Sequence, residues 1–97
     1  MLQKEQPSEK NVTQVTFMLP ADVEGEAICV MGDFNDWQTS HTMERQEDGS
    51  WQLTVDLEPE HEYEFRYLVD GHVWLNDPEA DKYVLNPYGS HNCVVIT

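Results

Sequence analysis

The chain has 97 residues, which is enough for one hydrophobic core but not for a second domain. Nineteen Asp and Glu against five Lys and Arg give a formal net charge of −14, which disfavours nucleic acid and anionic membranes as partners. A neutral polymer is neither attracted nor repelled by this charge, and a solvated surface without a specific partner explains it equally well. No window is apolar enough to cross a bilayer, and the first six residues lack the apolar core of a signal peptide, so we expect a cytoplasmic protein.

The first ten residues are polar and show no periodicity. We therefore expect a disordered lead-in over 1–10 and one folded domain over 11–97. Within that domain, turn-forming residues recur every ~8–12 positions, a spacing typical of an all-β sandwich or barrel. The strands expected in the first half of the domain cover 14–19, 27–31 and a short piece near 41–45.

The clearest alternation of apolar and polar residues occurs in two neighbouring segments, 51–58 and 62–69. Each should have one buried and one solvated face. Asp70-Gly71 follows directly and is a strong signal for a two-residue hairpin that returns through 73–75. Further extended pieces are expected at 83–85 and 93–97. Because no segment shows helical apolar spacing beyond a single turn, the fold class is predicted to be all-β.

The two cysteines, Cys29 and Cys93, lie in apolar, strand-like surroundings. In a reducing compartment such residues are buried free thiols. A disulfide between them stays open at this point, because the sequence gives no distance between the two strands.

Residues with catalytic or metal-binding chemistry are present but scattered. The carboxylates fall mostly on solvated strand faces and turns, and the four histidines occur singly without ligand spacing. No serine has a nucleophile-elbow context, and there is no glycine-rich phosphate loop. Segment 76–81 is rich in oxygen ligands but lacks the glycine and terminal glutamate of a calcium loop. We therefore expect no enzymatic activity, no metal and no cofactor.

Two tryptophans have a different character. Trp37 follows an apolar strand that ends at Gly32, and its neighbours are polar. An indole in that position favours contact with a flat apolar object such as the face of a sugar ring. Trp74 lies just beyond the Asp70-Gly71 turn, and the pair suggests a stacking platform for carbohydrate. As alternatives, Trp37 folds over an edge of the core and Trp74, between two apolar neighbours, is a core residue; Trp51 is interpreted as structural.

Planar polar side chains near these rings are suited to sugar hydroxyls. Arg66 offers a guanidinium fork and Asn92 an amide that both donates and accepts. Arg66 has the alternative of pairing with a neighbouring glutamate, and Asn92 that of stabilising its own backbone. Tyr88, in a Pro-Tyr-Gly turn, is either a further contact or a loop anchor.

Four separated motifs occur in an order and spacing that resemble a known family: Gly32-Asp33-Phe34-Asn35-Asp36-Trp37, Tyr63 to Gly71, Trp74 with Asn76-Asp77-Pro78, and Asn86-Pro87-Tyr88-Gly89. Over about Val12 to Thr97 the chain resembles the family-48 carbohydrate-binding module, also called the isoamylase N-terminal or early-set domain. It is similar to the glycogen-binding domain of the AMP-activated protein kinase β subunit. The resemblance implies an immunoglobulin-like β-sandwich.

The resemblance also implies non-catalytic binding of α-1,4-glucan such as glycogen, starch or maltodextrin. The carbohydrate-binding residues that it implies are Trp37, Arg66, Trp74, Tyr88, Ser90 and Asn92. The sequence departs from the kinase domains in carrying arginine instead of lysine at position 66, tyrosine at the apolar loop position 88, and one additional residue before Trp74. The alternative function is a protein-interaction or scaffold module that docks on a glucan-branching or debranching enzyme of another chain.

Overall fold

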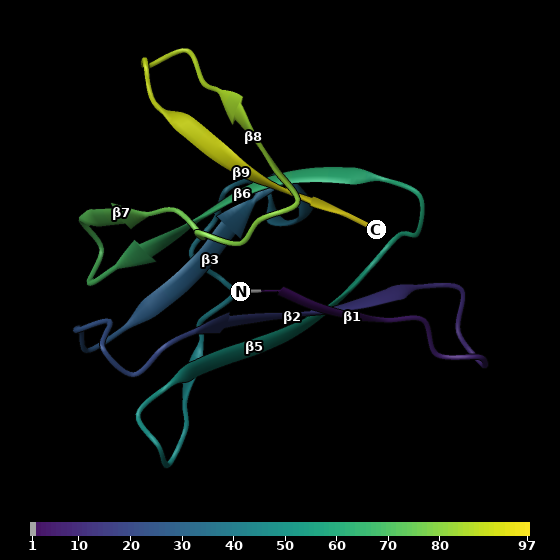
Figure 1. Cartoon of the computed structure of the whole chain (residues 1–97), viewed down its shortest axis with the longest axis horizontal. Coiled ribbons are helices and arrows are strands. Elements are labelled where there is room, and N and C mark those ends of the chain that lie inside the picture. Colours follow the sequence, from purple (N-terminus) through teal and green to yellow (C-terminus); the bar gives the residue numbers. More distant parts are fainter. Residues whose placement is uncertain (1) are drawn as a thin grey trace.

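A computed structural model describes residues 2–97 and shows two antiparallel β-sheets packed face to face (Figure 1). The architecture is an immunoglobulin-like, early-set β-sandwich, as predicted. The predicted limit of one helical turn is also confirmed, because the described helical structure is η1, a 3-10 turn at Asp33–Asn35. None of the described helical structure has the length and apolar character required to cross a membrane.

The first sheet has the strand order β1-β2-β5-β4 and forms the lower layer in Figure 1. Its strands are β1 (Leu2–Glu5), β2 (Thr13–Leu19), β4 (Glu44–Arg45) and β5 (Trp51–Leu57). The register of β2 on β5 pairs Phe17 with Leu53, which places the apolar residues of both strands on the same face.

Strand β1 differs from the expected disordered lead-in at residues 2–5. Its polar side chains give no alternation, but its backbone pairs with β2, with Leu2 opposite Phe17. Backbone pairing at a sheet edge does not depend on apolar side chains, and for that reason composition alone missed this strand. Met1 lies outside the described residues, and the domain boundary at residue 11 stays a prediction.

The second sheet has the strand order β3-β6-β9-β8, with β7 paired to β6 beside β9. Its strands are β3 (Ile28–Gly32), β6 (Glu62–Val69), β7 (Val73–Leu75), β8 (Lys82–Leu85) and β9 (His91–Ile96). The predicted hairpin at Asp70-Gly71 is present, and both residues have positive φ, 52° and 79°. Its loop has three residues rather than the predicted two, because Val69 pairs with Val73 and His72 lies outside the ladder. The hairpin connects β6 to β7.

The core lies between the sheets and consists of the inward-facing residues of both. Phe17, Phe65 and Tyr67 are fully buried there, with edge-to-face ring contacts at centroid distances of 5.0 to 6.5 Å. Trp51 is also buried, as predicted, and its indole N–H donates to the carbonyl oxygen of Val23. Because alternate residues of a strand face opposite ways, burial of 65, 67 and 69 turns Glu64, Arg66 and Leu68 to the outer face of the second sheet.

Both cysteines are free thiols, Cys93 fully buried and Cys29 half-buried. The disulfide that the sequence left open is therefore not formed in this structure. Cys93 lies on the inner face of β9, where burial raises the pKa of its thiol.

Strand β6 changes partners along one of its edges. Its first half pairs with β9 as far as Phe65 opposite Cys93, and its second half pairs with β7 from Tyr67 opposite Leu75. Arg66 lies between these two ladders, where β7 and β9 diverge. This junction, on the outer face of the second sheet, positions the candidate site.

Candidate functional site

A cavity of about 460 Å³ lies over the partner-switch point of β6. The residues that line it are Trp37, Arg66, Trp74, Asn86, Pro87, Tyr88, Ser90 and Asn92. The six residues singled out from sequence are all among them. The structure thus brings together side chains from five places in the chain, although their role in binding stays a prediction.

Trp37 stands at a strained corner that follows η1. Asp36 and Trp37 have φ values of 54° and 57°, a left-handed conformation that is uncommon for a bulky side chain. The backbone N–H of Trp37 donates to the carbonyl oxygen of Gly32 at 2.9 Å. Strain of this kind persists only where the surrounding contacts impose it. The indole is half-buried at the edge of the cavity and is not a core residue.

The carboxylate of Asp33 stabilises this corner, because each of its two oxygens accepts a hydrogen bond. Oδ1 accepts a hydrogen bond from the indole Nε1 of Trp37 at 3.1 Å, and Oδ2 accepts one from the backbone N–H of Glu64 at 2.8 Å. The corner is thereby attached to β6. Since the indole N–H is already bonded, Trp37 is left to contact a ligand through its ring face.

Gly32 allows the corner to lie close to β6. An added Cβ atom would overlap the carbonyl oxygen of Glu64 and lie 2.9 Å from Phe65 Cβ. Its backbone is extended, with φ −171°, so the requirement for glycine here is the lack of a side chain rather than an unusual conformation.

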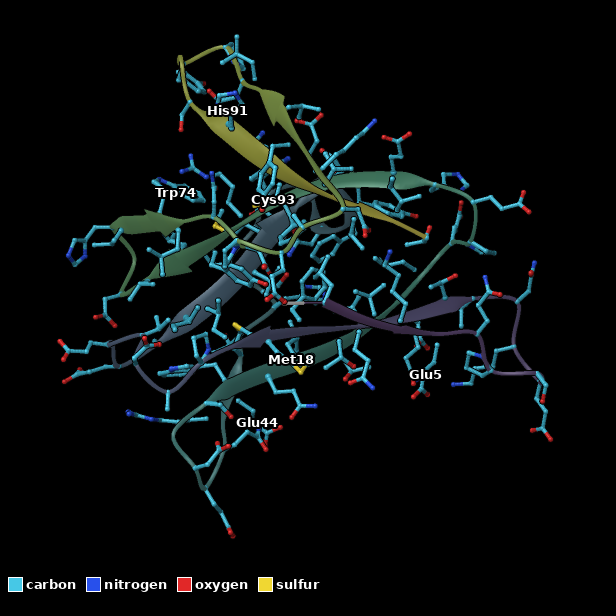
Figure 2. The ribbon with its side chains drawn as sticks, viewed as in Figure 1. Glu5, Met18, Glu44, Trp74, His91 and Cys93 are labelled. Carbon is cyan, nitrogen blue, oxygen red and sulfur yellow. The ribbon has the colours of Figure 1, made fainter. Side chains whose placement is uncertain are left out.

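Trp74 stands on the regular strand β7, opposite Leu68 of β6, and is 43% exposed. Figure 2 shows its side chain on the side of β7 that faces the β8–β9 hairpin. The alternative that Trp74 is a core residue is wrong, because its side chain lies on the outer face of the sheet and remains 43% exposed. The hairpin before β7 is anchored by Asp70, whose carboxylate accepts from the backbone N–H groups of Ala27 and Glu26. These bonds hold the pKa of Asp70 below its ordinary value.

Arg66 is placed at the floor of the cavity between the two ladders. Its Nε donates to Asn76 Oδ1 at 2.8 Å, and its guanidinium carbon lies 5.5 Å from the ring centroid of Trp74. The alternative of a glutamate partner is not observed within residues 2–97, since Glu62 pairs with Lys82 and Glu64 accepts from Asn92. The terminal amino groups of the guanidinium are thus available to a ligand.

The loop between β8 and β9 forms the remaining wall. Asn86 organises it: its side-chain oxygen accepts from the backbone N–H groups of Tyr88 at 3.0 Å and Ser90 at 3.1 Å. Its Nδ2 donates to Asn92 Oδ1 at 3.2 Å, and Asn92 Nδ2 in turn donates to Glu64 Oε1 at 3.1 Å. Tyr88 is 92% exposed at the tip, so it is not an anchor packed against the domain.

A buried polar cluster lies beneath the site. The carboxylate of Asp77 is fully buried. It accepts one hydrogen bond from the hydroxyl of Tyr67 at 2.7 Å and another from the backbone N–H of Glu79 at 2.8 Å. Its backbone N–H donates to Cys93 Sγ at 3.0 Å. Burial, and then the charge of Asp77, raise the pKa of Tyr67 above its ordinary range, so its hydroxyl stays protonated and donates. The cluster fixes the segment after β7 to the core.

Sequence reasoning missed Asn86 and Pro87 as lining residues, and Asp33, Glu64 and Asn76 as the partners of the lining side chains. Asn86-Pro87-Tyr88-Gly89 does carry a turn signal that indicates an asparagine bonding to its own loop. Glu64 and Asn76 carry no local signal, because each acts on a partner in another part of the chain. Asp33 bonds both to Trp37, four residues later, and to the backbone of Glu64, 31 residues later.

Two comparisons with known proteins bear on this site. Residues 11–96 match the model of the family described as the glycogen recognition site of AMP-activated protein kinase. The chain is also similar to Protein FLOURY ENDOSPERM 6, chloroplastic, from Oryza sativa subsp. japonica, with 38% identity over 65 residues. That alignment covers 67% of this chain and 11% of the rice protein, so the chain spans only a small part of its relative.

The second comparison contradicts the expected cytoplasmic location, because the relative is chloroplastic by name. The expectation depended on an N-terminus without an apolar stretch, and that property argues only against a secretory signal peptide, since transit peptides are not apolar. The family match covers nearly the whole domain, including every residue that lines the cavity. This chain therefore belongs to the family of the glycogen recognition site of AMP-activated protein kinase, and is a carbohydrate-binding module.

Proposed function

We propose that the domain binds α-1,4-glucan without transforming it, and that the cavity beside β6 is the binding site. The observation that carries this proposal is the convergence of two indole rings and one guanidinium on a single cavity. Flat apolar rings with a few planar polar groups are the combination that sugar recognition requires. A neutral glucan also meets no electrostatic barrier on a chain of net charge −14.

The roles follow from which atoms remain free. Trp37 and Trp74 stack on the apolar faces of glucose units, Trp37 with its N–H bonded to Asp33. The terminal amino groups of Arg66 donate to vicinal hydroxyls, and Asn92 and Ser90 add hydrogen bonds from the opposite wall. Tyr88, exposed at the loop tip, extends the apolar contact beyond the two indoles.

Most of these side chains are fixed before any ligand arrives. Trp37 is bonded to Asp33, Arg66 to Asn76, and Asn92 to both Asn86 and Glu64. Side chains that are already ordered lose less conformational entropy on binding, which favours affinity. The described residues that line the cavity include no carboxylate and no histidine, so this pre-organised surface is suited to holding a polymer rather than to cleaving it.

Calorimetric titration of maltoheptaose, with the β-linked cellohexaose as the control ligand, tests the proposal. We expect saturable binding of maltoheptaose alone and loss of most affinity in Trp37→Ala and Trp74→Ala, since aromatic anchors dominate such contacts. Leu85→Ala is the matched control, because Leu85 is 70% exposed beside the loop but does not line the cavity. Absence of maltoheptaose binding to the wild type, or equal loss in the Leu85 variant, would contradict the proposal.

Two other outcomes identify the alternatives. Release of reducing ends from amylose by the purified domain would contradict non-catalytic binding. A docking module would be favoured instead if the wild type binds a glucan-metabolising enzyme but no sugar, and if Trp37→Ala no longer binds that enzyme. Tryptophan is common in both kinds of contact, so the titration has to come first.

A further inference from the structure

Arg66 occupies a position on β6 where the sheet leaves a gap. The β9 ladder ends one residue before it and the β7 ladder begins one residue after it. Asn76, the residue that follows β7, spans this gap with its side-chain amide. Its Oδ1 accepts from Arg66 Nε at 2.8 Å, and its Nδ2 donates to the carbonyl oxygen of His91 at 2.9 Å.

The amide thus restrains an otherwise mobile side chain. Arginine has many rotamers, and ordering it costs conformational entropy. Among the described residues, Asn76 is the one hydrogen-bond partner of the Arg66 guanidinium, and Trp74 provides the one aromatic face beside it. A bond at Nε sets the orientation of the planar fork, so both terminal amino groups are placed together rather than singly.

The hydrogen bond from Asn76 Nδ2 to the carbonyl oxygen of His91 fixes the position of Asn76 Oδ1, the atom that accepts from Arg66. Asn76 Oδ1 is placed relative to β9 and not only to the end of β7, because the same amide plane carries both groups. Asn76 thereby fixes the position of Arg66 relative to β9, the strand that carries Asn92 on the opposite wall of the cavity. One amide therefore sets the relation between the two main hydrogen-bonding groups of the cavity.

We propose that Asn76 is a positioning residue for glucan binding that acts through Arg66, although it does not itself line the cavity. This inference depends on the proposed function for its ligand. The competing explanation is that Asn76 only joins the segment after β7 to β9, so that its loss loosens the whole wall. The two explanations differ in whether Arg66 is required for the effect.

A double-mutant cycle separates them. Asn76→Ala is expected to weaken maltoheptaose binding about three- to tenfold, the range for the net effect of one ordinary hydrogen bond, because the bond is lost from a positioning group and not from the ligand itself. In an Arg66→Ala background, Asn76→Ala should change the affinity less than about twofold, because contacts that act as a unit are not additive. Asn11→Ala, at an exposed asparagine with no side-chain bond in the described structure, is the matched control and should bind as the wild type does. Additive losses, or no loss in Asn76→Ala, would overturn the proposal.

A second measurement needs no ligand. In the ¹⁵N NMR spectrum of the wild type, the Arg66 Nε–H signal should be protected from exchange, and in Asn76→Ala that protection should be lost while the backbone amide spectrum stays dispersed. An unprotected Arg66 signal in the wild type would overturn the inference even if glucan binds. A protected signal with no glucan binding would support the Asn76–Arg66 restraint and contradict the proposed function alone.

Discussion

The two sides of the cavity, each carrying one tryptophan, are held in different ways. Trp37 is fixed mainly within its own loop, by the carbonyl of Gly32 and the carboxylate of Asp33, at a backbone corner with φ 57°. Trp74 lies on a regular strand, and its indole N–H has no hydrogen-bond partner among the residues that the structure describes. Its position comes from the β6–β7 register and from Arg66 beside its ring.

This difference has a consequence for how each side responds to change. The Trp37 corner stores local strain and depends on short contacts with the end of β3. The Trp74 side depends on the core, because the segment that follows β7 is bonded through Asp77 to Tyr67 and Cys93. We therefore expect substitutions near Gly32 to move Trp37 selectively, and substitutions beneath β7 to move Trp74 and Arg66.

Gly32→Ala should have the largest effect. Its Cβ atom would overlap the Glu64 carbonyl oxygen, so β3 must move away from β6 at the Trp37 corner. Overpacking of this kind costs about 1–3 kcal/mol, and we expect a value near the top of that range. Thermal denaturation and the Trp37 indole signal in NMR measure it. Gly71→Ala separates the two possible costs: no atom lies within 4 Å of its added Cβ, but its φ is 79°, so any loss of stability there comes from backbone strain and not from overlap. An unchanged melting temperature in Gly32→Ala would contradict the packing argument.

Tyr67→Phe should reveal the dependence of the Trp74 side on the core. The variant removes the hydroxyl that donates to the buried carboxylate of Asp77, and a lost bond of this type costs about 1–3 kcal/mol. Urea unfolding gives the free energy. Indole spectra of the folded variant should show a shift at Trp74 and little change at Trp37. The reverse pattern would contradict the proposed division between the two sides.

Asp33→Ala should affect Trp37 with a smaller cost in stability. Both bonds of the carboxylate are exposed, so we expect a loss of about 0.5–1.5 kcal/mol in stability. The Trp37 Nε1 proton should exchange faster with water and the affinity for maltoheptaose should fall, while the chemical shift of the Trp74 indole stays unchanged. Asp22→Ala, at an exposed carboxylate outside this corner and without a positive φ, controls for loss of charge. Equal behaviour of the two variants would show that Asp33 does not orient the indole.

Acid should weaken the Trp74 side through Asp70, and this is the smallest expected effect. Because the pKa of Asp70 is lowered in the folded state, its stabilising contribution is complete above its ordinary pKa of 3.8 and is lost as the pH falls through the lower, folded-state pKa. Melting curves of the wild type and Asp70→Asn should therefore differ most above pH 3.8 and converge below it. Parallel curves across that range would contradict a role for the ionised carboxylate in anchoring the hairpin.

Much of the fold was predictable because strand geometry is local. Alternate residues face opposite ways, so Val15, Phe17 and Leu19 indicated a buried face without knowledge of the partner strand, and all three are in the core. Asp70-Gly71 indicated a hairpin because two consecutive residues with positive φ favour that pair. The short strand expected near 41–45 is present in part, as Glu44–Arg45 with a bridge from Thr42 to Cys29.

Strand β1 shows where local reasoning stops. A polar edge strand is stabilised by backbone hydrogen bonds to a partner that lies elsewhere in the chain, here with Leu2 opposite Phe17. Nothing in the composition of residues 2–5 indicates that partner. The same limit applies to the residues that hold the cavity wall.

The sequence by itself determined which strand faces are buried, where the chain turns, and which aromatic and polar side chains are candidates for a ligand. Only the tertiary structure decided how those candidates are oriented. Asn76 meets Arg66, Asp33 meets the backbone of β6, and Glu64 meets Asn92 across 10, 31 and 28 positions of the chain. Such bonds depend on the register and divergence of strands, which arise from the packing of the whole sandwich and leave no periodic trace in the sequence.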